Sequence, residues 1–206
     1  MVIAFIGGSG SGKDTQARLL SEKLDIPTIS AGAMLREAYE AGNPLGIEAS
    51  TYWKKGEWVP DEITSEIILN YINSHHIKEF IITGYPRFAE QAYTFDRILE
   101  VVGLKLTAVV HLSVEKSELW ERLQTQKIED PARKDTSEEA MGKRLDSYYE
   151  TIEPLLKKYA KDDILVNVDG TPSVTTVAAM IDEGLEKVPA FAVEISIKRE
   201  QKSIEN

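Results

Sequence analysis

The sequence contains no cysteine, and this absence excludes disulfide bonds and thiolate metal sites. It also lacks an apolar stretch approaching the roughly 20 residues that a membrane-spanning helix needs. The apolar run at residues 2–6 is too short for a secretory signal and has no basic flank. We therefore expect a cytoplasmic protein with no membrane partner.

Positive charge is scarce: 24 Lys and Arg residues stand against 34 Asp and Glu residues, for a net charge of −10. This balance argues against nucleic acid as the main partner. An acidic protein that binds a phosphorylated ligand must gather its arginines locally. The 206 residues, 42% of them hydrophobic, are enough for one domain with a substantial core.

Glycine, in contrast, is concentrated in residues 7–16, which read Gly-Gly-Ser-Gly-Ser-Gly-Lys-Asp-Thr-Gln. The stretch follows an apolar run typical of a buried strand and precedes apolar residues at helical spacing. Glycines let successive N–H groups converge, and the start of a helix adds partial positive charge. Lys13, one residue past Gly12, can reach the outer phosphates. The alternative is an ordinary glycine-rich turn, but four glycines and this lysine favour nucleotide phosphate binding.

Five short apolar runs predict buried strands at residues 2–6, 27–29, 80–82, 107–112 and 164–168. Helical patterns separate them, so the chain is expected to form a parallel sheet covered by helices on both faces. Ligands of such sheets bind at the carboxyl ends of the strands, where the glycine-rich stretch lies.

Three segments lie outside this alternation. Residues 30–60 predict helices without a strand, which indicates a helical insertion. Residues 127–136 are polar and have no apolar periodicity. After residue 188, Phe191, Val193, Ile195 and Ile197 alternate, and we interpret this tail as an added edge strand or a disordered end.

Several blocks resemble those of the nucleoside monophosphate kinases, adenylate kinase above all. Residues 7–16 are similar to G-x-P-G-x-G-K-G-T-Q, residues 30–36 to S-T-G-D-M-L-R, and residues 55–61 to K-G-E-L-V-P-D. Residues 83–87 with Gln91 are similar to D-G-F-P-R and its following glutamine. Residues 133–135 and 143–145 are similar to R-x-D-D and K-R-L. Each block alone is weak evidence, but their order and spacing together make the resemblance strong.

The resemblance implies a three-layer α/β/α P-loop fold with a five-stranded parallel sheet. Its core would comprise residues 1–29, 61–126 and 137–188, with a nucleoside monophosphate (NMP)-binding insertion at 30–60. A short lid at 127–136 and a C-terminal tail at 189–206 complete the division. The implied activity is Mg²⁺-dependent, reversible transfer of the γ-phosphoryl group of ATP to AMP by a monomer.

The resemblance also assigns site residues. Those implied in ATP binding are Gly8, Ser9, Gly10, Ser11, Gly12, Lys13, Asp14, Thr15, Arg122, Gln126 and Pro172. Those implied in NMP binding are Ala31, Arg36, Glu57, Trp58, Val59, Gly84, Tyr85, Pro86, Arg87, Gln91, Arg133 and Arg144. Lys13, Arg87, Arg133 and Arg144 would act in catalysis, because phosphoryl transfer needs positioning and charge neutralisation more than covalent help.

Four positions depart from the family pattern. Thr83 and Ala33 replace aspartates, Gln126 replaces a lid arginine, and Asp14 replaces a glycine. One interpretation is drift in a slow or inactive homologue that only binds nucleotides. The other is compensation, in which Asp14 supplies the carboxylate for Mg²⁺ that Thr83 no longer provides.

The acceptor base is the remaining alternative. Ala31 stands where uridylate–cytidylate kinases carry alanine, whereas Gln91 is suited to hydrogen-bond both edges of adenine. AMP is favoured because hydrogen-bond readout of a base discriminates more strongly than one missing hydroxyl. A UMP or CMP acceptor stays open.

Overall fold

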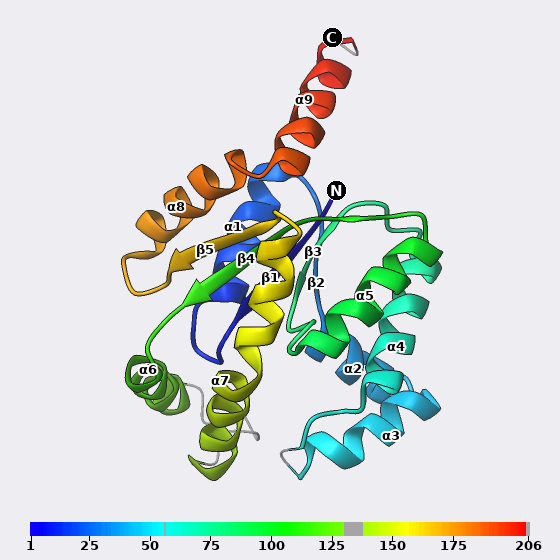
Figure 1. The fold of residues 1–206 in the computed structure, drawn as a ribbon. Helices are drawn as coiled ribbons and strands as arrows, with labels where there is room; N and C mark the ends of the chain where they lie inside the picture. The colour runs from blue at the N-terminus through cyan, green and yellow to red at the C-terminus, as the bar shows by residue number, and fades with distance from the viewer. Residues whose placement is uncertain (56, 130–137, 205–206) are drawn as a thin grey trace.

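The computed structural model describes the backbone of residues 1–55, 57–129 and 138–204, with the side chains of 126–129 and 202–204 excepted (Figure 1). Five parallel strands form one sheet in the order β2-β3-β1-β4-β5. They are β1 (Val2–Gly7), β2 (Thr28–Ser30), β3 (Phe80–Thr83), β4 (Leu106–Ser113) and β5 (Leu165–Asp169). All five predicted strands and their parallel arrangement are confirmed.

Helices connect successive strands, and further helices follow β5. They are α1 (Lys13–Leu24), α2 (Ala31–Glu40), α3 (Pro44–Trp53), α4 (Asp61–Ser74), α5 (Ala89–Val101), α6 (Lys116–Glu129), α7 (Glu138–Lys161), α8 (Val174–Glu186) and α9 (Pro189–Ile204). Among the described helices, none has the length and apolarity that crossing a membrane requires.

The sheet separates two apolar clusters because successive side chains of a strand point to opposite faces. Val2, Ala4 and Ile6 of β1 pack with α4, α5 and α7 on one face. Ile3 and Phe5 pack on the other face with α1, α8 and the start of α9. Layers of helix, sheet and helix result, as the alternation of elements predicts.

The tail is a helix, so the interpretation of residues after 188 as an edge strand or a disordered end is wrong. The alternating residues also stand four apart, which is helical spacing. Phe191 is 7% exposed and Ile195 packs beside it on the core, whereas Val193 and Ile197 face outward. Figure 1 shows α9 extending away from the sheet.

The carboxyl ends of the strands meet along one edge of the sheet. Phe5 pairs with Thr83, and Gly7 pairs with Leu112. Side chains and turns that follow β1, β3 and β4 are thereby brought together over this edge. The glycine-rich stretch after β1 therefore faces the turn after β3.

Candidate active site

The turn after β1 needs glycine at two positions. Gly10 has φ 85° and Gly12 has φ 86°, a left-handed conformation that residues with a Cβ rarely adopt. Gly12 is the N-cap of α1, and Lys13 is its first residue. The turn therefore directs the amino end of α1 at the cleft, as expected for a phosphate-binding loop.

Gly8 is required for a different reason, which is close approach. A Cβ at this position would lie 2.6 Å from Leu119 Cδ1 of α6 and 3.4 Å from the Tyr148 ring of α7. The loop is thus pressed between its own strand and two later helices.

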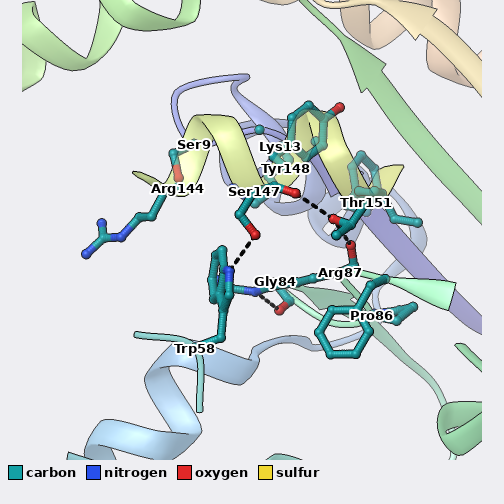
Figure 2. A pocket seen from close by; sticks show the side chains of 15 residues that line it. Ser9, Lys13, Trp58, Gly84, Pro86, Arg87, Arg144, Ser147, Tyr148 and Thr151 are labelled. Carbon is teal, nitrogen blue, oxygen red and sulfur yellow. Dashed lines mark hydrogen bonds between the residues drawn. The ribbon is translucent and has the colours of Figure 1, made fainter. Parts of the chain in front are cut away.

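One cleft collects loop, turn and helix residues (Figure 2). The predicted site residues that line it are Gly8, Ser9, Lys13, Trp58, Gly84, Pro86, Arg87 and Arg144. They come from the loop after β1, the segment before α4, the turn after β3, and α7.

Arg87 is the cation at the centre of this cleft. Its Nε donates to the Gly84 carbonyl at 2.8 Å, and its guanidinium carbon lies 4.1 Å from the centroid of the Trp58 ring. It forms no ion pair with a carboxylate in the described part of the chain. Burial, followed by the charge of Arg144, lowers the pKa of Arg87 to about 10, so it stays cationic at neutral pH. Two cations gathered in this way form a site for an anion.

Trp58 spans the cleft. Its indole N–H donates to Ser147 Oγ of α7 at 2.7 Å, while its ring stacks on Arg87. Figure 2 shows the indole between these two partners, with Arg144 extending away from the stack. A residue of the segment before α4 is thereby joined to α7 across 89 positions of sequence.

Gln91 and Ala31 lie next to the Arg87 turn. Gln91 is 3% exposed, and its Oε1 accepts from the backbone N–H of Arg87 at 2.8 Å. Ala31 begins α2, and its Cβ lies 4.0 Å from the place that a Cβ on Gly84 would take. Both residues proposed to select the base therefore border the same turn.

Arg122 of α6 holds the loop after β5. Its Nη1 donates to the Gly170 carbonyl at 3.0 Å and its Nη2 to the Thr171 carbonyl at 3.5 Å. The Nε of Arg122 also donates to Glu118 Oε1 at 2.7 Å, which fixes the same guanidinium. Arg122 and the loop that continues into Pro172 thus lie side by side, as their shared assignment to the donor base requires.

The adenylate kinase family model matches residues 5–164. The chain belongs to the adenylate kinase family. An adenylate kinase of Rhizobium meliloti is 40% identical over 189 residues, which cover 89% of this chain and 98% of the relative. An adenylate kinase of Nocardioides sp. is 36% identical over 190 residues, covering 92% and 99%. One of Methanocella arvoryzae is 32% identical over 215 aligned positions, covering 91% and 100%. The family is one of phosphotransferase enzymes.

Some residues that the family pattern assigns lie outside the cleft lining. Arg36 is on the exposed side of α2, and Glu57 and Val59 flank Trp58. Tyr85 is 1% exposed and donates to Asp61 at 2.8 Å, which places it in the core. Arg133 lies outside the described residues, as do the side chain of Gln126 and residues 130–136 of the lid predicted at 127–136. Residues 127–129 form the end of α6.

The loop offers one carboxylate to a metal. Asp14 is exposed in the first turn of α1, with its Oδ2 3.5 Å from Lys13 Nζ. Within the described residues, no three acidic or histidine side chains converge as metal ligands. Mg²⁺ in phosphoryl-transfer sites is usually held by one or two carboxylates, nucleotide phosphates and water. This donor set fits an ion of that kind, whereas Thr83, 1% exposed at the end of β3, adds no charge.

Among the lining residues that the motifs did not assign, three lie on α7: Ser147, Tyr148 and Thr151. They follow Arg144 at spacings of three, four and seven, which is one face of a helix. Thr151 Oγ1 donates to the Ser147 carbonyl at 2.7 Å and lies 3.4 Å from the carbonyl of Arg87. The helical period of α7 was therefore a signal that would have found them.

Proposed function

We propose that the protein catalyses the reversible transfer of the γ-phosphoryl group of ATP to AMP, giving two ADP, as a cytoplasmic monomer. The observation that carries this proposal is Arg87, a partly buried cation that forms no ion pair among the described residues and shares a cleft with Lys13. An acceptor phosphate on Arg87 and donor phosphates on the loop would meet in that cleft.

On the donor side, backbone N–H groups of the loop and Lys13 hold the outer phosphates of ATP. Arg122 and the backbone around Pro172 flank the adenine. Ser11 lies in the turn before α1, and Thr15 lies in the first turn of α1. The charge on the transferring group is spread over its oxygens, so fixed N–H groups and a lysine lower the barrier by electrostatic stabilisation.

On the acceptor side, Arg36, Arg87, Arg133 and Arg144 bind the monophosphate. Planar guanidinium groups suit this role because they donate two parallel hydrogen bonds to phosphate oxygens. Gln91 reads the base, with Ala31 beside it. In this arrangement Trp58 holds the Arg87 guanidinium flat against the cleft wall.

Mg²⁺, bound mainly by the phosphates and by Asp14, would neutralise negative charge on the transferring group. The NMP-binding insertion at 30–60 and the lid at 127–136 would close over both nucleotides. Closure excludes water, which would otherwise hydrolyse ATP.

A coupled assay of ADP formation with the Lys13→Met protein tests the proposal. We expect an unchanged circular dichroism spectrum and loss of nearly all turnover. The matched control is Lys23→Met on the same helix. Lys23 lies outside the cleft lining, and its Nζ is 2.8 Å from Asp182 Oδ1. Full activity of Lys13→Met would refute the mechanism.

A panel of AMP, UMP and CMP as acceptors decides the base. We expect AMP to give the highest kcat/KM. A preference for UMP or CMP would show that Ala31 rather than Gln91 governs selection. Tight binding of ATP and AMP without ADP formation would instead identify a non-catalytic homologue.

A further inference from the structure

A chain of polar side chains runs from the edge strand β5 to the phosphate loop. His111 of β4 is 5% exposed, and its Nδ1 lies 2.6 Å from Asn167 Oδ1 of β5. Its Nε2 lies 2.7 Å from the hydroxyl oxygen of Tyr148 on α7. Both ring nitrogens of this buried histidine therefore have a hydrogen-bond partner.

The hydrogen bonds of this chain have a single direction. Burial lowers the pKa of His111, so the imidazole is neutral and carries one N–H. That N–H is on Nδ1, because the carbonyl oxygen of Asn167 can only accept. Nε2 therefore accepts from the Tyr148 hydroxyl.

Tyr148 carries the chain to the loop. Burial, followed by the neighbouring Tyr149, raises the pKa of its hydroxyl, and the backbone N–H of Gly8 opposes that rise. The ring packs on the same glycine, since a Cβ on Gly8 would lie 3.4 Å from it. Tyr148 and Lys13 both line the cleft (Figure 2).

We propose that Asn167 and His111 are positioning residues that hold the Tyr148 ring against Gly8, and so keep the phosphate loop in the geometry that receives the donor phosphates. This inference rests on the proposed function, in which the loop binds ATP. Loop N–H groups stabilise phosphate best when the loop is held in place before the nucleotide arrives. A chain of neutral groups holds it there without placing a negative charge beside the phosphates.

The alternative is that the chain only satisfies buried polar atoms, as most buried polar groups are satisfied. The two readings differ in which ligand they affect. Loss of positioning weakens ATP binding and leaves AMP binding unchanged, whereas a general loss of packing weakens both or lowers only stability.

The experiment measures the Kd for ATP alone and for AMP alone by calorimetry on the full chain. Tyr148→Phe keeps the ring and removes the hydroxyl, His111→Phe removes both bonds of the imidazole, and the double variant combines them. The control is Tyr149→Phe, because the Tyr149 hydroxyl donates to the Val114 carbonyl at 2.5 Å and is not part of the chain.

We expect Tyr148→Phe to raise the Kd for ATP about threefold to tenfold, the worth of one hydrogen bond. The Kd for AMP should change less than twofold, and the double variant should be no weaker than the weaker single variant. His111→Gln, which offers both a donor and an acceptor, should recover most of the ATP affinity. Tyr149→Phe should match the unsubstituted protein.

An unchanged Kd for ATP in Tyr148→Phe, or an equal rise for both nucleotides, would overturn the positioning role. Should His111→Phe fail to fold, Tyr148→Phe and His111→Gln still decide the question. Because ATP alone is not turned over, this result is independent of catalysis. Absence of ADP formation by the unsubstituted protein would refute the proposed function alone, and absence of ATP binding would refute both.

Discussion

The two sides of the cleft are built by different means. The donor side is mainly backbone: Gly10 and Gly12 hold positive φ values, and the N-terminus of α1 follows at once. The acceptor side is mainly side chains: Arg87 is held by the Gly84 carbonyl, by the Trp58 ring, and by Gln91 beneath its backbone. Backbone conformation dominates the first side, and side-chain contacts, including that of Trp58 from a separate segment, dominate the second.

This difference teaches where each side is vulnerable. Donor geometry depends on the dihedral angles of a few glycines, so a single methyl group can distort it. Acceptor geometry is shared among contacts from separate elements, so each contact contributes a part and the charge itself contributes most. The following predictions order these effects by size.

The largest effect should come from removing the positive charge of Arg87 on the acceptor side. We expect Arg87→Ala to lower kcat/KM roughly 10²–10³-fold, because it removes a preorganised cation from the transferring charge. Steady-state kinetics with ADP detection measure the loss. Arg97→Ala is the control, since Arg97 is exposed on α5 and its Nη2 donates to Thr94 Oγ1 of the same helix. An equal loss in both variants would contradict the assignment.

The second largest effect should come from adding a methyl group to a glycine of the loop. The Cβ that Gly12→Ala adds would have no atom within 4 Å, so the substitution acts through backbone strain at positive φ alone. We expect a loss of roughly 1–2 kcal/mol in the free energy of unfolding. Displaced loop amides should also lower kcat/KM about 10²-fold. Gly103→Ala has φ 70° and equally open space, so it should lose the same stability in urea titrations and no activity. Equal activities would show that loop geometry is not critical.

The one carboxylate in the loop sequence 7–16 is Asp14. If it has replaced the aspartate missing at Thr83, Asp14→Gly should raise the Mg²⁺ concentration for half-maximal rate about tenfold. Thr83→Asp added to it should recover much of the loss, as expected of groups that serve one ion. Magnesium titrations of the single and double variants measure this. An unchanged midpoint would leave Asp14 only its favourable interaction with the helix dipole, worth roughly 0.3–1 kcal/mol.

The smallest effect should come from a single acceptor-side contact. Trp58→Leu removes the ring from Arg87 and the hydrogen bond to Ser147, and we expect the KM for AMP to rise about fivefold. Ser147→Ala removes the hydrogen bond alone and should raise it about twofold. The KM for ATP should stay unchanged in both. A larger effect of Ser147→Ala would mean that the bridge, not the stacking, positions the arginine.

The parts of the site that the sequence could predict are those determined locally. The loop follows from glycine spacing, and its place follows from the rule that parallel strands present their carboxyl ends at one edge. Arg87 and Arg144 were identified as motif members, and both line the cleft. The strand predictions succeeded most clearly for β1, β3 and β4, which are short and almost wholly buried, whereas β5 alternates buried and exposed residues.

The missed parts depend on tertiary contacts. The stacking of Trp58 on Arg87 joins segments that share no local pattern, so the motif assigned Trp58 to the monophosphate site without showing what its ring contacts. The tail was misread because an alternation at spacing two also contains spacing four, and the decision for α9 came from contacts of Phe191 with the core. Ser147 escaped because the helical period was not extended past the motif that carries Arg144.

The position of Trp58 also makes ligand binding at the acceptor site detectable by tryptophan fluorescence. Its indole is 38% exposed and hydrogen-bonded, with a cation over the ring, so its emission depends on contacts that a bound monophosphate would alter. The other tryptophans lie elsewhere: Trp53 packs on Tyr39 at 5.8 Å, and Trp120 packs on the apolar cluster beside α6. Phenylalanine at those two positions would leave one fluorophore, and nucleotide arrival could be followed in milliseconds without waiting for product.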